Sequence, residues 1–288
     1  MIAIFKKELN TYFKGITGYL FAAFLLFFVG IYVMAYNLSG YYSNFEYSLD
    51  SVTFVFLILV PLLSMRCVAE ERKQKTDQLL YSLPLKLSDV VIGKFLAMAV
   101  VLGVPVLVLT LYPLILSQFG AVSFGSAYGT ILAFYLLGGS LLSIGLFISS
   151  LTENQVSAAI ITLVVMILLY FLDALASFVS LDSQSSLSAL IIGVILLSIV
   201  LYFFGKNLMA SMIFGALSVC GLLLWHTISS SAFYGLFGTI IENLSLFSRF
   251  SSFVSGVFDL SAIVYFLSVI AVFIFLSIQE MEKRRWSE

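Results

Sequence analysis

The side chains that most often carry out catalysis are scarce in this chain of 288 residues. It has one histidine, His226, and two cysteines, Cys67 and Cys220, and none stands near partners at the spacing of a metal site or a hydrolase triad. No G-x-x-x-x-G-K-[ST] sequence occurs, so the chain lacks the loop that holds ATP phosphates in P-loop proteins. We therefore expect no enzyme activity and no cofactor or metal site in this chain.

Two residues inside apolar runs could serve movement or transport. Asp173 is the one acidic residue that falls clearly within such a run, and ionisable groups inside a membrane are functional candidates. It lies close to the end of its run, where contact with water or headgroups is the simpler explanation. Pro105 cannot donate a hydrogen bond to Val101 and so permits a kink. We keep Pro105 and Asp173 as candidate hinge or pathway residues.

Residues 68–89 contain eight charged residues. Glu70, Glu71 and Arg72 open this segment, and apolar Leu79 and Leu80 follow them. A charged turn beside apolar side chains forms a compact knob that needs burial against another surface. A fully solvated charged loop is the simpler alternative.

The composition shows which elements must position these residues. Of the chain, 61% is hydrophobic and only 10% is charged, against about 25% charged residues in a typical soluble domain. A helix needs about 20 apolar residues to cross a bilayer. We therefore predict an all-α integral membrane protein, a polytopic bundle of about eight transmembrane helices, at Thr17 to Tyr36, Val52 to Cys67, Val90 to Tyr112, Tyr128 to Ser150, Val156 to Phe178, Leu187 to Phe204, Leu208 to Ile228 and Leu260 to Ile278.

The positions of lysine and arginine predict the orientation, because positively charged loops stay on the cytoplasmic side. With the N-terminus inside, eight spans leave only Arg249 outside among the 14 basic residues. Both termini are therefore expected in the cytoplasm.

Two segments outside the spans have amphipathic patterns. Residues 1–14 place Ile2, Phe5 and Leu9 on one helical face and lysines on the other, which predicts an interfacial helix. Residues 229–258 alternate aromatic residues with glycine and serine, which predicts short helices at the outer leaflet.

The segment after the second run resembles ABC-2 type transporter permeases, which carry a P-x-x-x-M-R-x-x-x-E-E-R-x-x-G-T-x-x-x-L-x-x-x-P pattern followed by G-K-[FY]. The matching residues are Pro61, Met65, Arg66, Glu70, Glu71, Arg72, Thr76, Leu80, Pro84, Gly93, Lys94 and Phe95. Lys75 stands where the family usually has glycine. Residues 247–260 and Arg284-Arg285-Trp286 resemble the gliding-motility subgroup, and the sixth and seventh runs look like an insertion.

The resemblance implies a single permease domain over residues 1–288 that forms a dimer, with itself or with a related permease, in a prokaryotic cytoplasmic membrane. Two copies of a separate ATP-binding subunit, which would hold ATP and Mg, supply the energy, with export as the family default. The first, second and fifth spans would line the path, and residues 229–258 would form an outer gate. Contact with the ATPase would fall to Glu70, Glu71, Arg72, Thr76, Asp77 and Leu80, and more weakly to Lys6, Lys7 and Glu8.

Two other functions compete with this one. An ion-coupled secondary transporter would need buried charge pairs or a repeat between the two halves, and the sequence shows neither. A membrane scaffold that recruits an ATPase without moving cargo has the same docking surface, so the sequence does not separate it from a permease.

Overall fold

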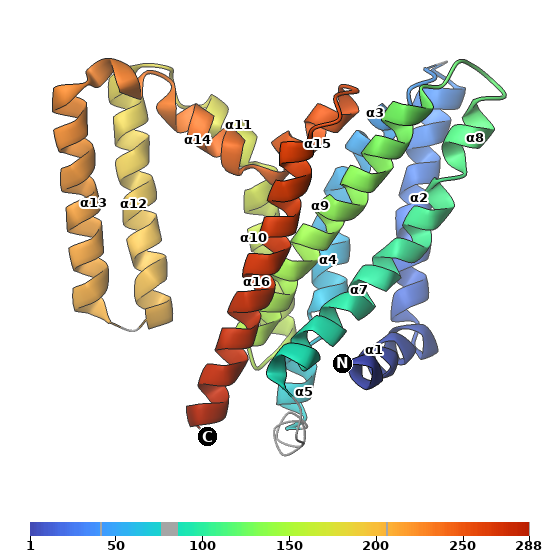
Figure 1. Ribbon diagram of the computed structural model, residues 1–288, viewed down its shortest axis with the longest axis horizontal. Coiled ribbons are helices and arrows are strands. Elements are labelled where there is room, and N and C mark those ends of the chain that lie inside the picture. Colours follow the sequence, from blue (N-terminus) through green and yellow to red (C-terminus); the bar gives the residue numbers. More distant parts are fainter. Residues whose placement is uncertain (41, 76–85, 206, 288) are drawn as a thin grey trace. The chain divides into compact units, whose positions relative to one another are not determined.

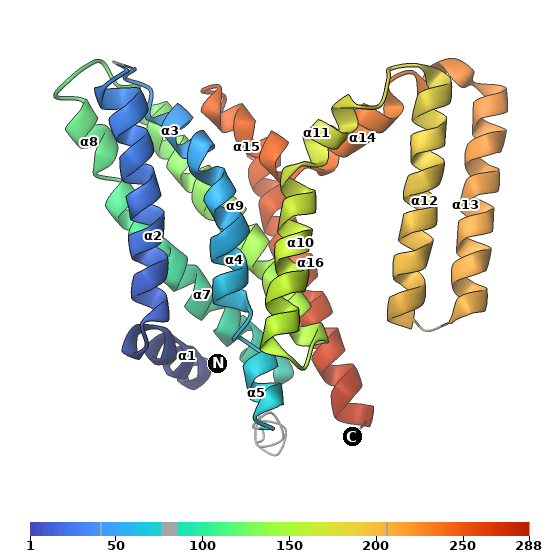
Figure 2. The same ribbon diagram turned by 180° about the vertical axis from the view of Figure 1, so that it is seen from behind.

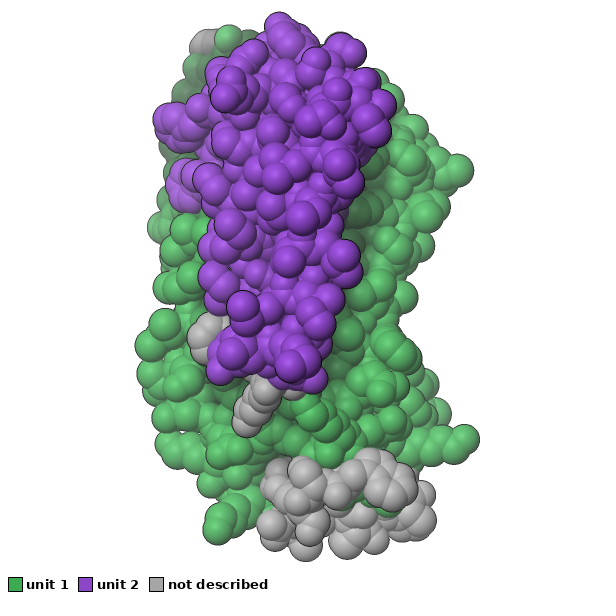
Figure 3. All heavy atoms as spheres, turned by 90° about the vertical axis from the view of Figure 1, so that its left-hand side faces the viewer, with its two compact units in different colours: residues 1–170, 249–288 green, residues 171–248 purple. Residues whose placement is uncertain are grey.

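The computed structural model describes residues 1–40, 42–75, 86–205 and 207–287, and every regular element in these ranges is a helix. The all-α prediction is therefore confirmed. The chain divides into two compact units, coloured separately in Figure 3: unit 1 comprises Met1–Tyr170 and Arg249–Glu288, and unit 2 comprises Phe171–Ser248.

Unit 1 is a bundle of long helices with a short helix across one end. The short helix is α1 (Ile2–Lys14), which lies crosswise to α2 (Thr17–Tyr32) in both ribbon views (Figures 1 and 2). The other elements are the π-helix η1 (Val33–Leu38), α3 (Phe45–Val52), the 3-10 helix η2 (Thr53–Val55), α4 (Phe56–Ser64), α5 (Ala69–Lys73), α7 (Leu87–Leu109), α8 (Tyr112–Leu116), α9 (Phe124–Leu151), α10 (Gln155–Tyr170) and α16 (Leu260–Ser287). The helix α15 (Leu246–Val254) crosses the unit boundary.

The core of unit 1 forms around α9, whose small residues let neighbouring helices approach closely. A Cβ atom on Gly138 would lie 2.7 Å from Leu102 of α7 and 2.9 Å from Phe56 of α4. A Cβ atom on Gly145 would lie 2.6 Å from the Ser64 hydroxyl at the end of α4. The small residues of α9 therefore allow α4 and α7 to pack closely against it.

Unit 2 is built on a helical hairpin of α12 (Ser183–Gly205) and α13 (Leu208–Ile228), followed by the 3-10 helix η3 (Ser230–Phe233). Ser183 bridges the start of α12 to the end of α13: its hydroxyl donates to the Ser230 carbonyl at 2.6 Å and lies 3.1 Å from His226 Nε2. The helices α11 (Leu172–Ser177) and α14 (Leu236–Leu244) pack together beside this hairpin. Residues 229–258 do form short helices, and their place at the outer leaflet stays a prediction.

Six helices among the described residues are long and apolar enough to cross a membrane: Thr17–Leu38, Phe45–Lys73, Leu87–Leu116, Phe124–Leu151, Leu208–Ile228 and Leu260–Arg285. Two shorter apolar stretches, Gln155–Tyr170 and Ser183–Ile199, correspond to the predicted fifth and sixth spans. The chain is thus a multi-pass helical membrane protein. The count of eight spans and the cytoplasmic placement of the termini stay predictions, although α1 and the C-terminal part of α16 lie at the same end of unit 1 (Figures 1 and 2).

Two predicted spans have different boundaries in the structure. The second begins at Phe45 rather than Val52, so Glu46 and Asp50 also lie in a candidate span, and the expectation that Asp173 is the only such acid was wrong. Amphipathic residues ahead of the apolar run continue its helix, which hydropathy alone does not detect. The fifth breaks at Phe171, and Asp173 lies in α11, outside the long helix.

The close approach at Gly145 predicts a sharp loss of stability in Gly145→Ala. Ser64 Cβ, 2.8 Å from the added methyl group, belongs to the helix and cannot turn away, so we expect a loss of about 1 to 3 kcal/mol. Thermal unfolding in detergent measures this loss of stability. Cys67 is buried, so it reacts with a thiol reagent only when the chain unfolds, and the exposed Cys220 is first replaced by serine.

Gly125→Ala is the matched control, because it lies on the same helix with no atom within 4 Å of the added carbon. It should leave the melting temperature unchanged or slightly raised. Equal effects of the two substitutions would show that α9 does not pack against α4 as described.

Candidate functional site

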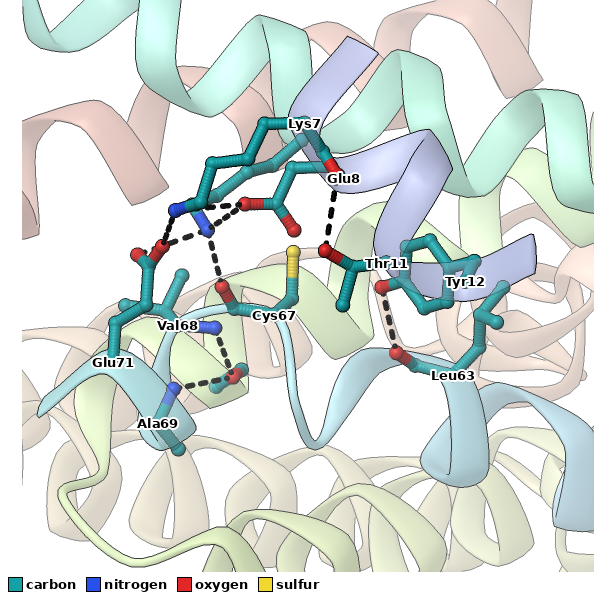
Figure 4. A network of polar contacts seen from close by, with 11 residues as sticks. Lys7, Glu8, Thr11, Tyr12, Leu63, Cys67, Val68, Ala69 and Glu71 are labelled. Carbon is teal, nitrogen blue, oxygen red and sulfur yellow. Dashed lines mark hydrogen bonds and ion pairs between the residues drawn. The ribbon is translucent and has the colours of Figure 1, made fainter. Parts of the chain in front are cut away.

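The most unusual side chain in the structure is Lys94, which is fully buried near the start of α7. Its ammonium group, Nζ, lies 3.0 Å from Glu8 Oε1 and 2.9 Å from Glu71 Oε2, and it donates a 2.6 Å hydrogen bond to the Cys67 carbonyl. Figure 4 shows the carboxylates of Glu8 and Glu71 converging with this carbonyl. A buried ammonium is tolerated only with such compensation, so Lys94 holds three chain segments together.

A second lysine completes the group from the exposed side. Lys7 Nζ lies 2.9 Å from Glu71 Oε1 and 3.8 Å from Glu8 Oε1 (Figure 4). Its side chain is 60% exposed, whereas that of Glu71 is 14% exposed. We call Lys7, Glu8, Glu71 and Lys94 the ion cluster. Its two positive and two negative charges give no net charge.

The helix α1 reaches the ion cluster because its buried face repeats every four residues, at Ile4, Glu8 and Tyr12. The Tyr12 hydroxyl donates to the Leu63 carbonyl of α4 at 3.1 Å, and burial raises the pKa of Tyr12 well above its usual value. Tyr12 is thus a neutral donor at physiological pH. Ile2 remains 67% exposed, as an interfacial helix requires, while Tyr12 faces the protein.

The turn between α4 and α5 is fixed to the end of α9. The Ser149 hydroxyl accepts hydrogen bonds from the backbone N–H groups of Val68 and Ala69, both at 3.2 Å. From α5, Arg72 donates to the carbonyls of Ser150 and Thr152. These bonds satisfy buried backbone groups at the start of α5 and the end of α9 that have no partner within their own helix, so α5 has a defined position against α9.

The C-terminal part of α16 is attached to the same region. Arg284 donates to the Leu151 carbonyl at 3.0 Å and forms a 3.0 Å ion pair with Glu153. We call α1, α5, residues 151–155 and the last turns of α16 the α1 end of unit 1. Four segments far apart in the sequence therefore meet at one end of the bundle (Figures 1 and 2).

The structure separates the predicted contact residues into two groups. Glu8, Glu71 and Arg72 point into the protein, where they contact other parts of the chain. Lys6 and Lys7 are exposed and Glu70 is partly exposed, so these three are open to a partner. Thr76, Asp77 and Leu80 lie outside the described residues.

The other two candidates lie away from the ion cluster. Pro105 is inside α7, which stays helical as far as Leu109, and its role as a hinge stays a prediction. The Asp173 carboxylate accepts a 2.8 Å hydrogen bond from the Ser245 hydroxyl within unit 2. This contact ties α11 to the residue after α14, which gives Asp173 a structural role.

In the sequence, Lys94 belongs to the Gly93-Lys94-Phe95 match and falls among the basic residues expected on the cytoplasmic side. The available signal was its position seven residues after Leu87, in a helix that from Val90 onward is otherwise apolar and in which a lysine needs acidic partners. Lys75, which replaces the usual glycine, has a φ of 55°, the left-handed region that glycine favours. No group of three or more His, Cys, Asp or Glu among the described residues could hold a metal ion.

A bundle of apolar helices long enough to cross a membrane, with charged elements gathered at one end, defines a multi-pass membrane protein. The family model described as "ABC-2 family transporter protein" matches residues 35–219, which is more than half of the chain. The chain therefore belongs to the ABC-2 transporter family, and it is a membrane permease of an ABC transporter. Such permeases in general associate with an ABC ATP-binding subunit. A search of curated proteins found no match.

The ion cluster predicts very different effects for its two lysines. Lys94→Met removes the buried cation between two largely buried carboxylates and leaves them only the exposed Lys7, so we expect a loss of about 3 to 5 kcal/mol in the free energy of unfolding. Lys7→Met removes an exposed partner and should cost less than about 1 kcal/mol. Unfolding by SDS, followed by circular dichroism, measures both variants.

A double-mutant cycle of Lys94→Met with Glu71→Gln is the control for a direct interaction. It should give a coupling energy of about 0.5 to 3 kcal/mol, as contacting groups do. Additive effects would mean that the two side chains do not form the buried pair.

Proposed function

We propose that this chain is the permease half of an ABC transporter and that a separate ATP-binding subunit docks on the α1 end of unit 1. The observation that carries this proposal is that the ion cluster fixes α1 and α5 there. Arg72 and Arg284 attach α5 and α16 to the end of α9 and the residues after it. A free cytoplasmic loop would not require such fixation, whereas a surface that receives force from a partner would. Membership of the ABC-2 family supports the same conclusion.

The docking surface consists of the charged side chains that the α1 end leaves open. Lys6 on α1 and Lys73 on α5 are exposed, and Glu70 is partly exposed, with its carboxylate 3.4 Å from Gln74 Nε2. The inward-facing Glu71 and Arg72 would set the position of α5 without touching the partner. The expected contact residues on α5 are therefore Glu70, which the sequence predicted, and Lys73, which is exposed beside it.

The remainder of the transporter follows from the resemblance. The complete complex would hold two ATP-binding subunits, each with ATP and Mg, and two permeases, which are identical or closely related. This chain would carry no enzyme activity or cofactor of its own. It would lie in a prokaryotic cytoplasmic membrane with both termini inside and would export its substrate. The C-terminal sequence pattern supports the gliding-motility subgroup.

The first, second and fifth spans are our candidate lining of the path. Tyr32 stacks on Tyr36 at 5.9 Å between ring centroids and meets Phe54 of η2 edge to face at 6.2 Å. Asp50, in the second span, is exposed. Aromatic and charged side chains on an open face suit a path better than contact with lipid tails.

Glu70→Lys tests the docking surface. Because Glu70 has no part in the ion cluster, reversing its charge should leave the chain folded and weaken co-purification with the ATP-binding subunit by about tenfold, with a parallel loss of ATPase activity. Glu71→Lys would place a third cation against Lys7 and Lys94 and is expected to unfold the α1 end instead.

The matched control is Gln118→Lys, an exposed position just after α8, at the opposite end of unit 1 from α1 (Figure 1). It should bind the ATPase as the native chain does. If no ATPase binds the native chain, the permease needs another energy source and an ion-coupled mechanism replaces this proposal. If ATPase binding is equal in Glu70→Lys and the native chain, the docking surface lies elsewhere.

A further inference from the structure

The helix α1 is packed more closely against α7 than a chance contact would be. A Cβ atom on Gly93 of α7 would lie 3.3 Å from Ile4 Cγ2 of α1 and from the Met1 carbonyl oxygen, a contact tight enough that α1 would have to shift slightly to admit a larger residue. One residue further along α7, Lys94 binds Glu8 at 3.0 Å. Steric contact and a buried ion pair therefore fix α1 on α7 within two adjacent residues.

The helix α5 is fixed to the same lysine. Glu71 of α5 lies 2.9 Å from Lys94 Nζ, and the Cys67 carbonyl, in the turn that leads into α5, accepts the 2.6 Å hydrogen bond. Both contacts are buried, so they are screened little by water. Lys94 thus binds the two elements of the proposed docking surface at once.

The connection from α1 to α2, the helix that follows it in sequence, is weaker than the connection from α1 to α7. Between α1 and α2 the backbone is extended at Gly15, with φ −84° and ψ 174°, and Ile16 is 80% exposed. The contacts between these helices include the edge-to-face pair of Phe13 and Tyr19 and the close approach of Gly18 to the Tyr12 carbonyl. A bend with apolar contacts can change its angle more easily than a buried ion cluster can open.

We propose that Lys94 is the positioning residue that joins α1 and α5 to α7, so that a displacement of the docking surface moves the third membrane helix before it moves the first. This inference rests on the proposed function for the origin of the displacement. The clamp itself is a property of the chain alone, and the two parts are tested separately.

Hydrogen exchange on the full chain in nanodiscs tests the clamp without any ATPase. In Lys94→Met, amide exchange in residues 2–14 should rise by roughly tenfold or more, because α1 can leave α7 by local opening. Lys7→Met should change it by less than about twofold, since Lys7 is mostly exposed. Glu8→Gln, which keeps the shape of the side chain, gives the same readout if Lys94→Met does not fold. Unchanged exchange in Glu8→Gln and Lys94→Met would overturn the clamp.

A disulfide tests whether α1 and α7 move together. Ile4→Cys with Gly93→Cys places two Cβ atoms about 3.4 Å apart, close to the 3.5 to 4.5 Å of natural disulfides. The background carries Cys67→Ala and Cys220→Ser, and the first of these keeps the backbone carbonyl that binds Lys94.

With Lys94 present, the disulfide should leave the ATPase activity of the complex within about twofold of the reduced form, because the two helices already move as one. In Lys94→Met we expect activity to fall by roughly tenfold. The disulfide replaces only the link between α1 and α7, so it should restore part of this activity until dithiothreitol is added. If Lys94 only stabilised the fold, the ATPase activity of Lys94→Met would not be expected to depend on this one cross-link between α1 and α7.

The outcomes are distinct. A disulfide that blocks activity in the presence of Lys94, and releases it on reduction, means that α1 moves against α7 and overturns the inference. A raised exchange rate in Lys94→Met with no ATPase bound to the native chain would keep the clamp and reject the proposed function. Rescue by the disulfide together with raised exchange supports both.

Discussion

One buried positive charge sets the arrangement of the α1 end. An ammonium group removed from water must be surrounded by acceptors, and Lys94 obtains them from Glu8, Glu71 and the Cys67 carbonyl. This requirement turns Glu8 of an otherwise interfacial helix toward the protein and brings α5 under the bundle. The hydrogen bonds from Val68 and Ala69 to Ser149 then fix the same turn from its other side. The shape of the docking surface follows from the neutralisation of a single side chain.

Hydropathy predicted the long helices well because a membrane span is a property of composition. The seventh predicted run, Leu208 to Ile228, has the bounds of α13. It did less well where a helix continues with polar residues, as at Glu46 and Asp50, or where an apolar run breaks without a proline, as at Phe171. In those places the ends depend on tertiary packing, which local composition does not record.

The candidate site was only partly predictable. The motif identified the correct segment, but Glu70 and Glu71 are neighbours in sequence with different surroundings, since one faces out and the other meets Lys94. Which face of so short a helix is buried depends on partners at positions 8 and 94, and no spacing rule connects residues that far apart. A lysine placed seven residues into an apolar helix was the one local sign of that connection.

The order of Glu8, Glu71 and Lys94 along the chain also affects how the protein is made. Glu8 and Glu71 both precede Lys94, so both carboxylates have been synthesised before the third long helix leaves the ribosome. The lysine can therefore be neutralised as soon as its helix enters the bilayer, and it does not wait for a later segment. Synthesis in this direction makes both acids before the lysine, whereas a chain without its first helix would lack Glu8, one of the two acids.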